Sequence, residues 1–329
     1  MFDRYLITGA TGFLGRAVVQ ALTAEAVPIR ALVLPWDPLS DLLPEGVEQT
    51  PGDVTNPASL ADFFRGAGAD TCLIHCAGMI SIASRPGAKI YHVNVEGTGA
   101  LIHQCFKHQV GRMVYVSSVH ALPEKPKGQI ITEEADFSPE KVTGAYAQTK
   151  AMATRLVLAA AKEGLNASVV FPSGLIGPGS MQSDSFTVMA RRFLQGKLPF
   201  AVRGGYDFAD VRDVAAGIIA CAGKGRSGEG YILSGHYMTI KDMLNLMGKA
   251  AGVKHRPLYL PLSLAKLAAP HFERKALRQG SPLFFTPYSV GVLASNGRFS
   301  RAKAEGELGY KVRGMEETLR DMAGWMKKS

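Results

Sequence analysis

Two ionisable side chains lie one helical turn apart near the middle of the chain. Tyr146 and Lys150 are four residues apart in a segment with helical spacing, so both project from the same helix face. A phenol has an ordinary pKa of about 10 and transfers its proton poorly at neutral pH. An adjacent ammonium group favours the phenolate and lowers that pKa, which suits general acid–base catalysis. The pair therefore predicts proton transfer to or from a substrate oxygen.

A glycine-rich segment near the N-terminus could bind phosphate groups. Residues 8–15 read TGATGFLG, and they connect a short apolar run to a segment with helical spacing. The three glycines allow a tight turn, close approach of a pyrophosphate and close helix–strand contact, while free N–H groups at the helix start attract negative charge. We expect this segment to bind a dinucleotide through Gly9, Thr11, Gly12, Phe13, Leu14 and Gly15.

The elements that must position these residues alternate between strand and helix patterns in the first half. Strands separated by helices of ten or more residues indicate parallel βαβ units. The sequence therefore predicts an α/β fold, a Rossmann-type doubly wound parallel sheet with a smaller C-terminal substrate-binding lobe. The expected strands are Arg4–Thr8, Ile29–Leu34, Val47–Thr50, Thr71–Ala77, Arg112–Ser117 and Ala167–Phe171. The expected helices are Phe13–Ala26, one that starts at Pro57, Ile90–His108 and Thr143–Glu163.

The pattern changes after Pro172, where proline and glycine cluster. We expect residues 1–171 to form the NAD(P)-binding domain and residues 172–329 mainly the substrate-binding lobe, with residues 207–235 partly returning to the first domain. Helices are expected at Asp210–Ala222, Thr239–Ala251, 300–309 and 314–328, and a strand at Gly230–Leu233. For the apolar and basic segment 258–295 we favour a substrate lid, with plain packing in the second lobe and contact with a membrane surface as the less favoured alternatives. Pro270 is expected to end a helix after about two turns.

The motifs resemble a known family over nearly the whole chain. TGATGFLG, the Asp53–Val54 pair, LIHCAG at 73–78, NVEGT at 94–98, VYVSS at 114–118 and Tyr146-x-x-x-Lys150 occur in the order of an extended short-chain dehydrogenase/reductase of the NAD-dependent epimerase/dehydratase superfamily. FPSGLIGPGS at 171–180, FADVRDVAAGI at 208–218, GEGYILSG at 228–235 and SRAKAEGELGY at 300–310 resemble its dihydroflavonol-reductase and 3β-hydroxysteroid-dehydrogenase-like branch. The first half also resembles sugar-nucleotide epimerases and dehydratases.

This resemblance implies roles for further residues in catalysis. Ser118, the second serine of the pair that ends a strand, would hold a substrate carbonyl by a hydrogen bond, with Ser117 as the neighbouring candidate. Lys150 would also bind the nicotinamide ribose. Asn94, an indifferent helix former inside a helix pattern, would hold water or Lys150 in place, or would mark a helix kink.

The resemblance also implies the remaining contacts of a nicotinamide cofactor. Asp53 and Val54 would contact the adenine, while Ala77 and Gly78 would line the dinucleotide. Pro172 would lie by the nicotinamide amide together with Ser173.

One position bears on the choice between NAD and NADP. Leu34 stands where the family carries an acid or an arginine, Asp37 follows three residues later, and residues 31–64 contain no basic residue. A 2′-phosphate would meet a carboxylate there and no cation, so we favour NAD over NADP, unless a distant arginine folds in.

The other polar residues carry weaker expectations. His75 lies in a buried strand pattern and is expected to be a core histidine, whereas His120 could line the substrate pocket. Asp210, Arg212 and Asp213 open a helix, which suits helix capping and pairing between the two lobes.

Charge and cysteine content limit the classes of partner. The net charge is +9, and residues 240–329 hold 16 basic and 7 acidic residues, whereas the two signs balance before them. The basic residues form no run of five and no nucleic-acid motif accompanies them, so we expect a solvated surface, no nucleic acid and no membrane contact. Four scattered cysteines predict neither a disulfide framework nor a metal site. We expect a cytoplasmic protein that forms a homodimer through segments 90–108 and 143–163.

The function favoured by these features is hydride transfer between a nicotinamide and a ketone, aldehyde or secondary alcohol on a bulky apolar substrate. The pocket is expected near residues 79–85, 119–125, 173–186 and 258–295, which are rich in apolar residues. A sugar-nucleotide epimerase or dehydratase is the alternative, with Arg191, Arg192 and Arg203 available for a diphosphate. A dinucleotide-binding sensor without catalysis is a third class, whose members commonly lack the Tyr/Lys pair.

Overall fold

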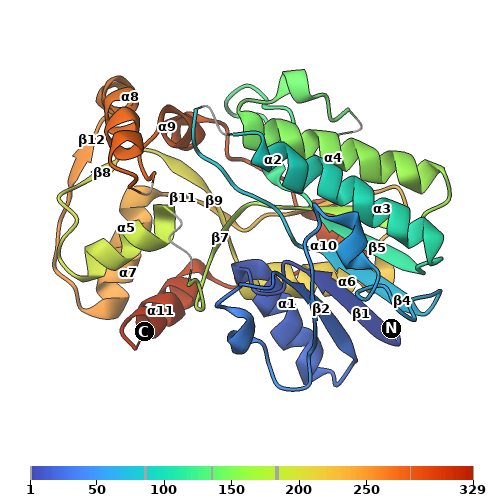
Figure 1. Cartoon of the computed structure of the whole chain (residues 1–329). Coiled ribbons are helices and arrows are strands. Elements are labelled where there is room, and N and C mark those ends of the chain that lie inside the picture. The colour runs from blue at the N-terminus through green and yellow to red at the C-terminus, as the bar shows by residue number, and fades with distance from the viewer. Residues whose placement is uncertain (1, 85–86, 135, 182–184, 282, 329) are drawn as a thin grey trace.

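A parallel sheet of seven strands forms the larger of two lobes (Figure 1). The computed structural model describes every residue except 1, 85–86, 135, 182–184, 282 and 329. The order across the sheet is β10-β6-β5-β4-β1-β2-β3, and every neighbouring pair runs parallel. The strands are β1 (Arg4–Thr8), β2 (Ile29–Val33), β3 (Glu48–Pro51), β4 (Thr71–His75), β5 (Arg112–Val116), β6 (Ala167–Pro172) and β10 (Gly230–Leu233).

Helices cover both faces of this sheet because each central strand is apolar on both sides. In β1, Tyr5 and Ile7 pack into one core cluster and Leu6 packs into another. Helices α1 (Phe13–Ala24) and α6 (Val211–Lys224) cover the first face, whereas α3 (Gly97–Lys107) and α4 (Ala145–Lys162) cover the second (Figure 1). The predicted Rossmann-type fold is confirmed.

Two expected helices differ from the prediction. The segment from Pro57 is a 3-10 turn, Pro57–Leu60, and not an α-helix. The expected helix Ile90–His108 is interrupted: α2 (Lys89–Tyr91) leads into a π-helical turn at His92–Glu96, which leads into α3. A π-helical turn inserts one residue into the helical ladder and is often found at functional sites.

The sheet places a ligand crevice beside β1. The chain passes from β1 to β2 on one side, whereas β4 lies on the other side of β1, so the strand order reverses at this point. In open α/β sheets, ligands bind beyond the carboxyl ends of the strands at such a reversal. The glycine-rich turn after β1 and the loop after β4 both lie there.

The second lobe contains two small sheets and five helices of the described chain (Figure 1). One sheet has the order β11-β9-β7 and the other pairs β12 with β8. Its strands are β7 (Gly174–Ile176), β8 (Phe200–Val202), β9 (Gly205–Asp210), β11 (His236–Thr239) and β12 (Leu258–Leu260). Its helices are α5 (Ser185–Leu194), α7 (Ile240–Ala251), α8 (Leu262–Arg278), α9 (Pro287–Ala294) and α11 (Met315–Met326), while α10 (Ala302–Leu308) packs beside α6 and β10.

Helix α8 corrects one expectation. It continues through Pro270 to Arg278, so the predicted break is wrong. Proline has no N–H group, so the carbonyl of Lys266 loses its partner in the helix. Pro270 and Lys266 are both exposed, so water can bind this carbonyl and the helix can continue. No helix within the described part of the chain has the length and apolar character that crossing a membrane requires.

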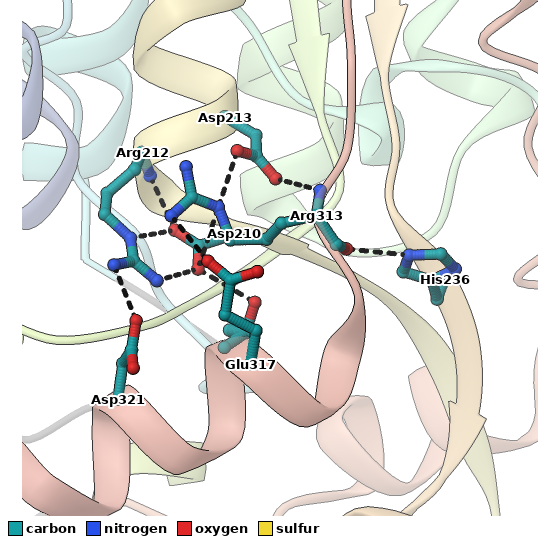
Figure 2. A network of polar contacts seen from close by, with 8 residues as sticks. Asp210, Arg212, Asp213, His236, Arg313, Glu317 and Asp321 are labelled. Atoms are coloured by element: carbon teal, nitrogen blue, oxygen red, sulfur yellow. Dashed lines mark hydrogen bonds and ion pairs between the residues drawn. The ribbon is translucent and has the colours of Figure 1, made fainter.

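A network of charged side chains fastens α11 to the start of α6 (Figure 2). Asp210 caps α6 by accepting from the backbone N–H of Arg212, and it also accepts from that side chain at 2.7 Å. Arg212 reaches Asp321 of α11 at 2.8 Å, and Arg313 donates to Asp213 at 2.8 Å. Burial raises the pKa of Asp210, but the bonds from Arg212 outweigh this and leave it below its ordinary value. The predicted capping and pairing of these residues is confirmed.

Candidate active site

Three of the predicted catalytic side chains converge at the carboxyl end of β5. Tyr146 and Lys150 project from the first turns of α4, and Ser118 lies two residues after the end of β5. All three are buried, with 9%, 4% and 6% of their surface exposed. The Lys150 ammonium donates to the carbonyl of Val116 at 2.8 Å and lies 4.9 Å from the centre of the Tyr115 ring. The carboxyl end of β5 thus fixes the position of the amine.

The pKa values of this group depend mainly on burial. Burial raises the pKa of Tyr146, and a hydrogen bond from Ser118 partly opposes the rise. The sequence predicted that Lys150 lowers the pKa of Tyr146, and this prediction is wrong, because burial raises that pKa instead. Burial also lowers the pKa of Lys150 to about 8, so the amine titrates within reach of physiological pH. A base with a pKa near the working pH exchanges protons readily.

Asn94 lies in the π-helical turn, and its side chain holds the loop that follows β4. Its Oδ1 accepts from the backbone N–H of Met79 at 2.7 Å, and its Nδ2 donates to the Met79 carbonyl at 3.0 Å and to Thr149 Oγ1 at 3.0 Å. The side chain makes no hydrogen bond to Lys150 among the described residues. Asn94 therefore orients the loop beside Gly78, where a Cβ atom would lie 3.1 Å from Lys150 Nζ.

The glycine-rich segment forms the tight turn that the sequence predicts. Gly9 has a φ of +66°, and a Cβ atom there would lie 2.6 Å from the backbone nitrogen of Ala77. A Cβ atom on Gly15 would lie 2.0 Å from the Gly9 carbonyl oxygen, so only glycine lets α1 approach the turn. Helix α1 starts after Gly12 without a side-chain cap, and its first-turn N–H groups remain available to an anion.

Asp37 lies beside this turn. Its carboxylate accepts from Thr11 Oγ1 at 2.6 Å and from the backbone N–H of Leu39 at 2.9 Å.

A second residue near the turn, Arg16, was not anticipated from the sequence. It is 7% exposed, donates through Nη2 to the carbonyl of Gly179 at 2.5 Å, and has a buried Nη1 with no partner among the described residues. Burial lowers the pKa of Arg16, and the nearby Asp37 carboxylate opposes this effect only in part.

The remaining predicted cofactor residues lie at the ends of three strands. Asp53 follows β3 and accepts from the backbone N–H of Thr55 at 2.8 Å, while Val54 packs so closely on α3 that a Cβ atom on Gly97 would lie 2.8 Å from it. Ala77 follows β4 and donates its backbone N–H to Thr8 Oγ1 at 3.2 Å. Pro172 ends β6, and the buried Ser173 follows it.

His75 is a structural residue at the end of β4. It is fully buried, with Nδ1 2.7 Å from Thr8 Oγ1 and Nε2 3.0 Å from Thr98 Oγ1. Burial lowers its pKa to about 3, so the ring is neutral at physiological pH. The expectation of a core histidine is confirmed.

A cavity of about 480 Å³ opens beside Tyr146 and extends into the second lobe. Its walls are mostly apolar, and the segment 258–295 contributes Phe272, Phe284 and Phe285 among others. His120 lines the cavity, as expected. Among the described lining residues, Arg192 carries the one positive charge, and its guanidinium lies 5.7 Å from the centre of the Phe284 ring. Residues 85, 182–184 and 282 of the expected pocket segments lie outside the described residues.

Comparison with known proteins agrees with this geometry. Residues 5–234 match the family described as "NAD dependent epimerase/dehydratase family". The chain is 28% identical to "Sterol demethylase protein B" of Methylococcus capsulatus, over 98% of each chain. It is 31% identical to a Synechocystis protein named "Putative dihydroflavonol 4-reductase", over 99% of this chain and 95% of the other.

A solved structure supports the fold alone. The Thermus thermophilus UDP-glucose 4-epimerase in complex with NAD superposes with a TM-score of 0.78 at 19% identity, over 99% of each chain. The glycine turn, the buried Tyr146–Lys150 pair and the match over residues 5–234 lead to one conclusion: the chain belongs to the NAD-dependent epimerase/dehydratase family, the extended short-chain dehydrogenases/reductases.

Proposed function

We propose that this protein transfers hydride between a nicotinamide cofactor and a ketone, aldehyde or secondary alcohol of a bulky apolar molecule. The observation that carries the proposal is that Tyr146, which has Ser118 as a neighbour, lines a largely apolar cavity of about 480 Å³. Ligand cavities of roughly 300–1,000 Å³ enclose most of a molecule of drug-like size. Relatives named for a sterol pathway and for a flavonoid reductase support an apolar ring system.

The side chains divide the chemistry of carbonyl reduction. When bound, the nicotinamide supplies the hydride that the protein itself lacks. The Ser118 hydroxyl donates a hydrogen bond to the substrate carbonyl and holds it in place. The Tyr146 phenol donates the proton that the developing alkoxide requires, and the Lys150 ammonium, one helical turn further along α4, would favour the phenolate that remains. The same groups in reverse accept the proton of a secondary alcohol.

The residues present fit a dinucleotide. The turn at Gly9 and the uncapped start of α1 offer N–H groups to a pyrophosphate. Arg16, in the first turns of α1, has a buried Nη1 without a partner among the described residues, and this group could donate to the dinucleotide. The Asp37 carboxylate, fixed by Thr11, would accept the 2′-hydroxyl of an adenosine ribose.

A preference for NAD(H) over NADP(H) is expected from this arrangement. A 2′-phosphate beside Asp37 would bring two anions together, which costs binding free energy. The measurement is kcat/KM with both cofactors, together with their Kd values. A higher efficiency with NADPH would contradict the preference and would assign the Nη1 of Arg16 to the 2′-phosphate; Arg16→Met would then remove that advantage.

A sugar-nucleotide epimerase or dehydratase is the second candidate, because the fold is shared with such enzymes. A sugar nucleotide carries two negative charges on its diphosphate. Of the three arginines considered for it, Arg192 lines the cavity, whereas Arg191 and Arg203 do not. The cavity therefore favours the apolar substrate.

A single screen tests the proposed function against this alternative. The protein with NADH is offered cyclic ketones of increasing size, and the protein with NAD is offered sugar nucleotides. We expect oxidation of NADH by bulky apolar ketones and no epimerised or dehydrated sugar nucleotide. Conversion of a sugar nucleotide without net change in NADH would overturn the proposal.

A homodimer is expected in solution. Family members often pair through the two helices that are α3 and α4 here, and Phe106 and Leu156 on these helices are each 40% exposed. Burying such side chains against a second copy stabilises the pair. Sedimentation velocity at micromolar concentration measures the particle mass. A single species of monomer mass would contradict this expectation.

A further inference from the structure

A cluster of three polar rings lies in the cavity beside Tyr146, and the reaction described above does not use it. Tyr206 belongs to β9, His120 follows Ser118, and Tyr288 belongs to α9, so three distant parts of the chain contribute. His120 Nε2 lies 3.1 Å from the Tyr206 hydroxyl, and the two rings stack at 5.6 Å with an angle of 11° between their planes. The His120 ring centre lies 6.0 Å from that of Tyr146 and 6.0 Å from that of Tyr288.

The surrounding structure holds this cluster in place. The Tyr206 ring is 6% exposed and packs edge-on against Phe208 and Phe299. The backbone N–H of His120 donates to Ser118 Oγ at 3.2 Å, which ties the ring to the catalytic serine. Tyr288 packs over Gly144, just before α4, where a Cβ atom would lie 2.5 Å from its ring. The polar atoms therefore keep fixed positions relative to Tyr146.

Two polar positions of the cluster have no partner within the described chain. The Tyr288 hydroxyl is buried without a hydrogen bond. Among the described residues, the His120 ring forms its hydrogen bond through Nε2 and none through Nδ1. A buried hydroxyl without a partner costs roughly 1–3 kcal/mol, so such groups in folded proteins call for an explanation. A ligand oxygen bound here would satisfy both groups.

The ligand group that fits is uncharged. Burial lowers the pKa of His120 to about 4, so the ring is neutral at physiological pH and offers one donor and one acceptor. Burial also raises the pKa of Tyr288, which therefore stays a neutral phenol. A carboxylate or phosphate placed against these groups would lose its hydration without gaining a cation.

We propose that His120 and Tyr288, with Tyr206 holding His120, form a specificity subsite for a second, uncharged oxygen of the substrate, carried on a carbon close to the reacting one. This inference rests on the proposed function, because Tyr146 and Ser118 take the reacting oxygen. The substrate class that it names is an apolar ring system with a hydroxyl or carbonyl group next to the carbonyl that is reduced. A site built to hydrogen-bond a substrate group discriminates against an analogue without it.

The test compares α-tetralone with its α-hydroxy derivative, two ketones that differ by one hydroxyl group. Both kcat/KM with NADH and Kd for the NAD-loaded protein are measured. The wild type is expected to favour the hydroxyketone by about tenfold or more, which is the effect of one or two neutral hydrogen bonds. In His120→Phe, which keeps a ring stacked on Tyr206, and in Tyr288→Phe, which removes one oxygen atom, the ratio should fall towards one. Tyr259→Phe, outside the cavity, is the matched control and should keep the wild-type ratio.

The possible results separate the subsite from the proposed function. Absence of NADH oxidation by either ketone counts against the proposed function, whereas the ratio of the two Kd values still tests the subsite. Equal Kd values in the wild type, no binding of either ketone, or an unchanged ratio in both variants would overturn the subsite. Circular dichroism of each variant shows whether it folds; Tyr288→Phe preserves the ring that packs over Gly144, so the test does not depend on His120→Phe alone.

Discussion

Replacement of Tyr146 by phenylalanine is expected to lower kcat by about 10²–10⁴-fold while leaving the Kd of the nicotinamide cofactor nearly unchanged. The ring would still fill its place at the start of α4, but the hydroxyl proposed to give its proton to the substrate oxygen would be missing. Cofactor affinity is expected to depend on the glycine turn and on Asp37, which belong to other elements. Steady-state rates and a fluorescence titration with NADH measure the two quantities separately.

A matched control makes this result specific. Tyr259→Phe removes a phenol from β12, outside the cavity, and should keep both kcat and cofactor affinity. If Tyr146→Phe kept more than about a tenth of the wild-type kcat, Tyr146 would not be the general acid. A parallel loss of cofactor affinity would instead show that Tyr146 mainly supports the dinucleotide site.

The sheet lobe could be predicted from the sequence because its signals are local. Short apolar runs such as Arg4–Thr8 and Gly230–Leu233 coincide with strands of the structure, and glycines at fixed spacing mark the turn after β1. The interrupted helix around Asn94 could not be predicted in the same way. The π-helical turn there depends on hydrogen bonds to Met79 and Thr149, which are distant in sequence.

The second lobe gave weaker signals. Strands β7, β8 and β12 have three residues each, too few for a period to show. Pro270 favours a helix break in isolation, but tertiary contacts hold α8 on both sides of the proline. Ala265 and Ala269 pack against Val290 before it, and Glu273 accepts from the backbone N–H of Ser84 after it.

The site residues that could be predicted from the sequence are likewise those with local signals. Tyr146, Lys150, Ser118 and the glycines belong to compact motifs, so their type and spacing identified them. Arg16 could not be recognised, because its significance lies in a bond to Gly179, which is 163 residues away. The partnership of His120 with Tyr206 likewise depends on how β9 crosses the cavity, and the linear sequence carries no signal of that position.

Lys150 provides the strongest test of the electrostatics of this site, because the proposed function requires its amine whereas the burial of its charge opposes folding. The side chain is 4% exposed, and burial lowers its pKa from the ordinary 10.5 to about 8. Between these values the unfolded chain holds a proton that the native chain has released, so wild-type stability rises with pH across that window. Below about pH 8 the native protein bears the full cost of a charged amine in a buried place.

Substitution of Lys150 by methionine is therefore expected to inactivate the protein and to stabilise it at neutral pH. Removing the buried charge stabilises the native state by roughly 3 kcal/mol, the free energy that corresponds to the pKa shift. Losing the hydrogen bond to the Val116 carbonyl destabilises it by about 1 kcal/mol. The free energy of unfolding is therefore expected to rise by about 1–2 kcal/mol. Urea unfolding at pH values of about 7 and 10 should show the advantage shrinking as the pH rises through the window. Lys162→Met, at the exposed end of the same helix, is the control and should change neither activity nor this pH dependence. If the Lys150→Met protein were less stable than the wild type at neutral pH, the prediction would be contradicted. The hydrogen bond of the amine to β5 would then stabilise the native fold by more than the burial of its charge costs.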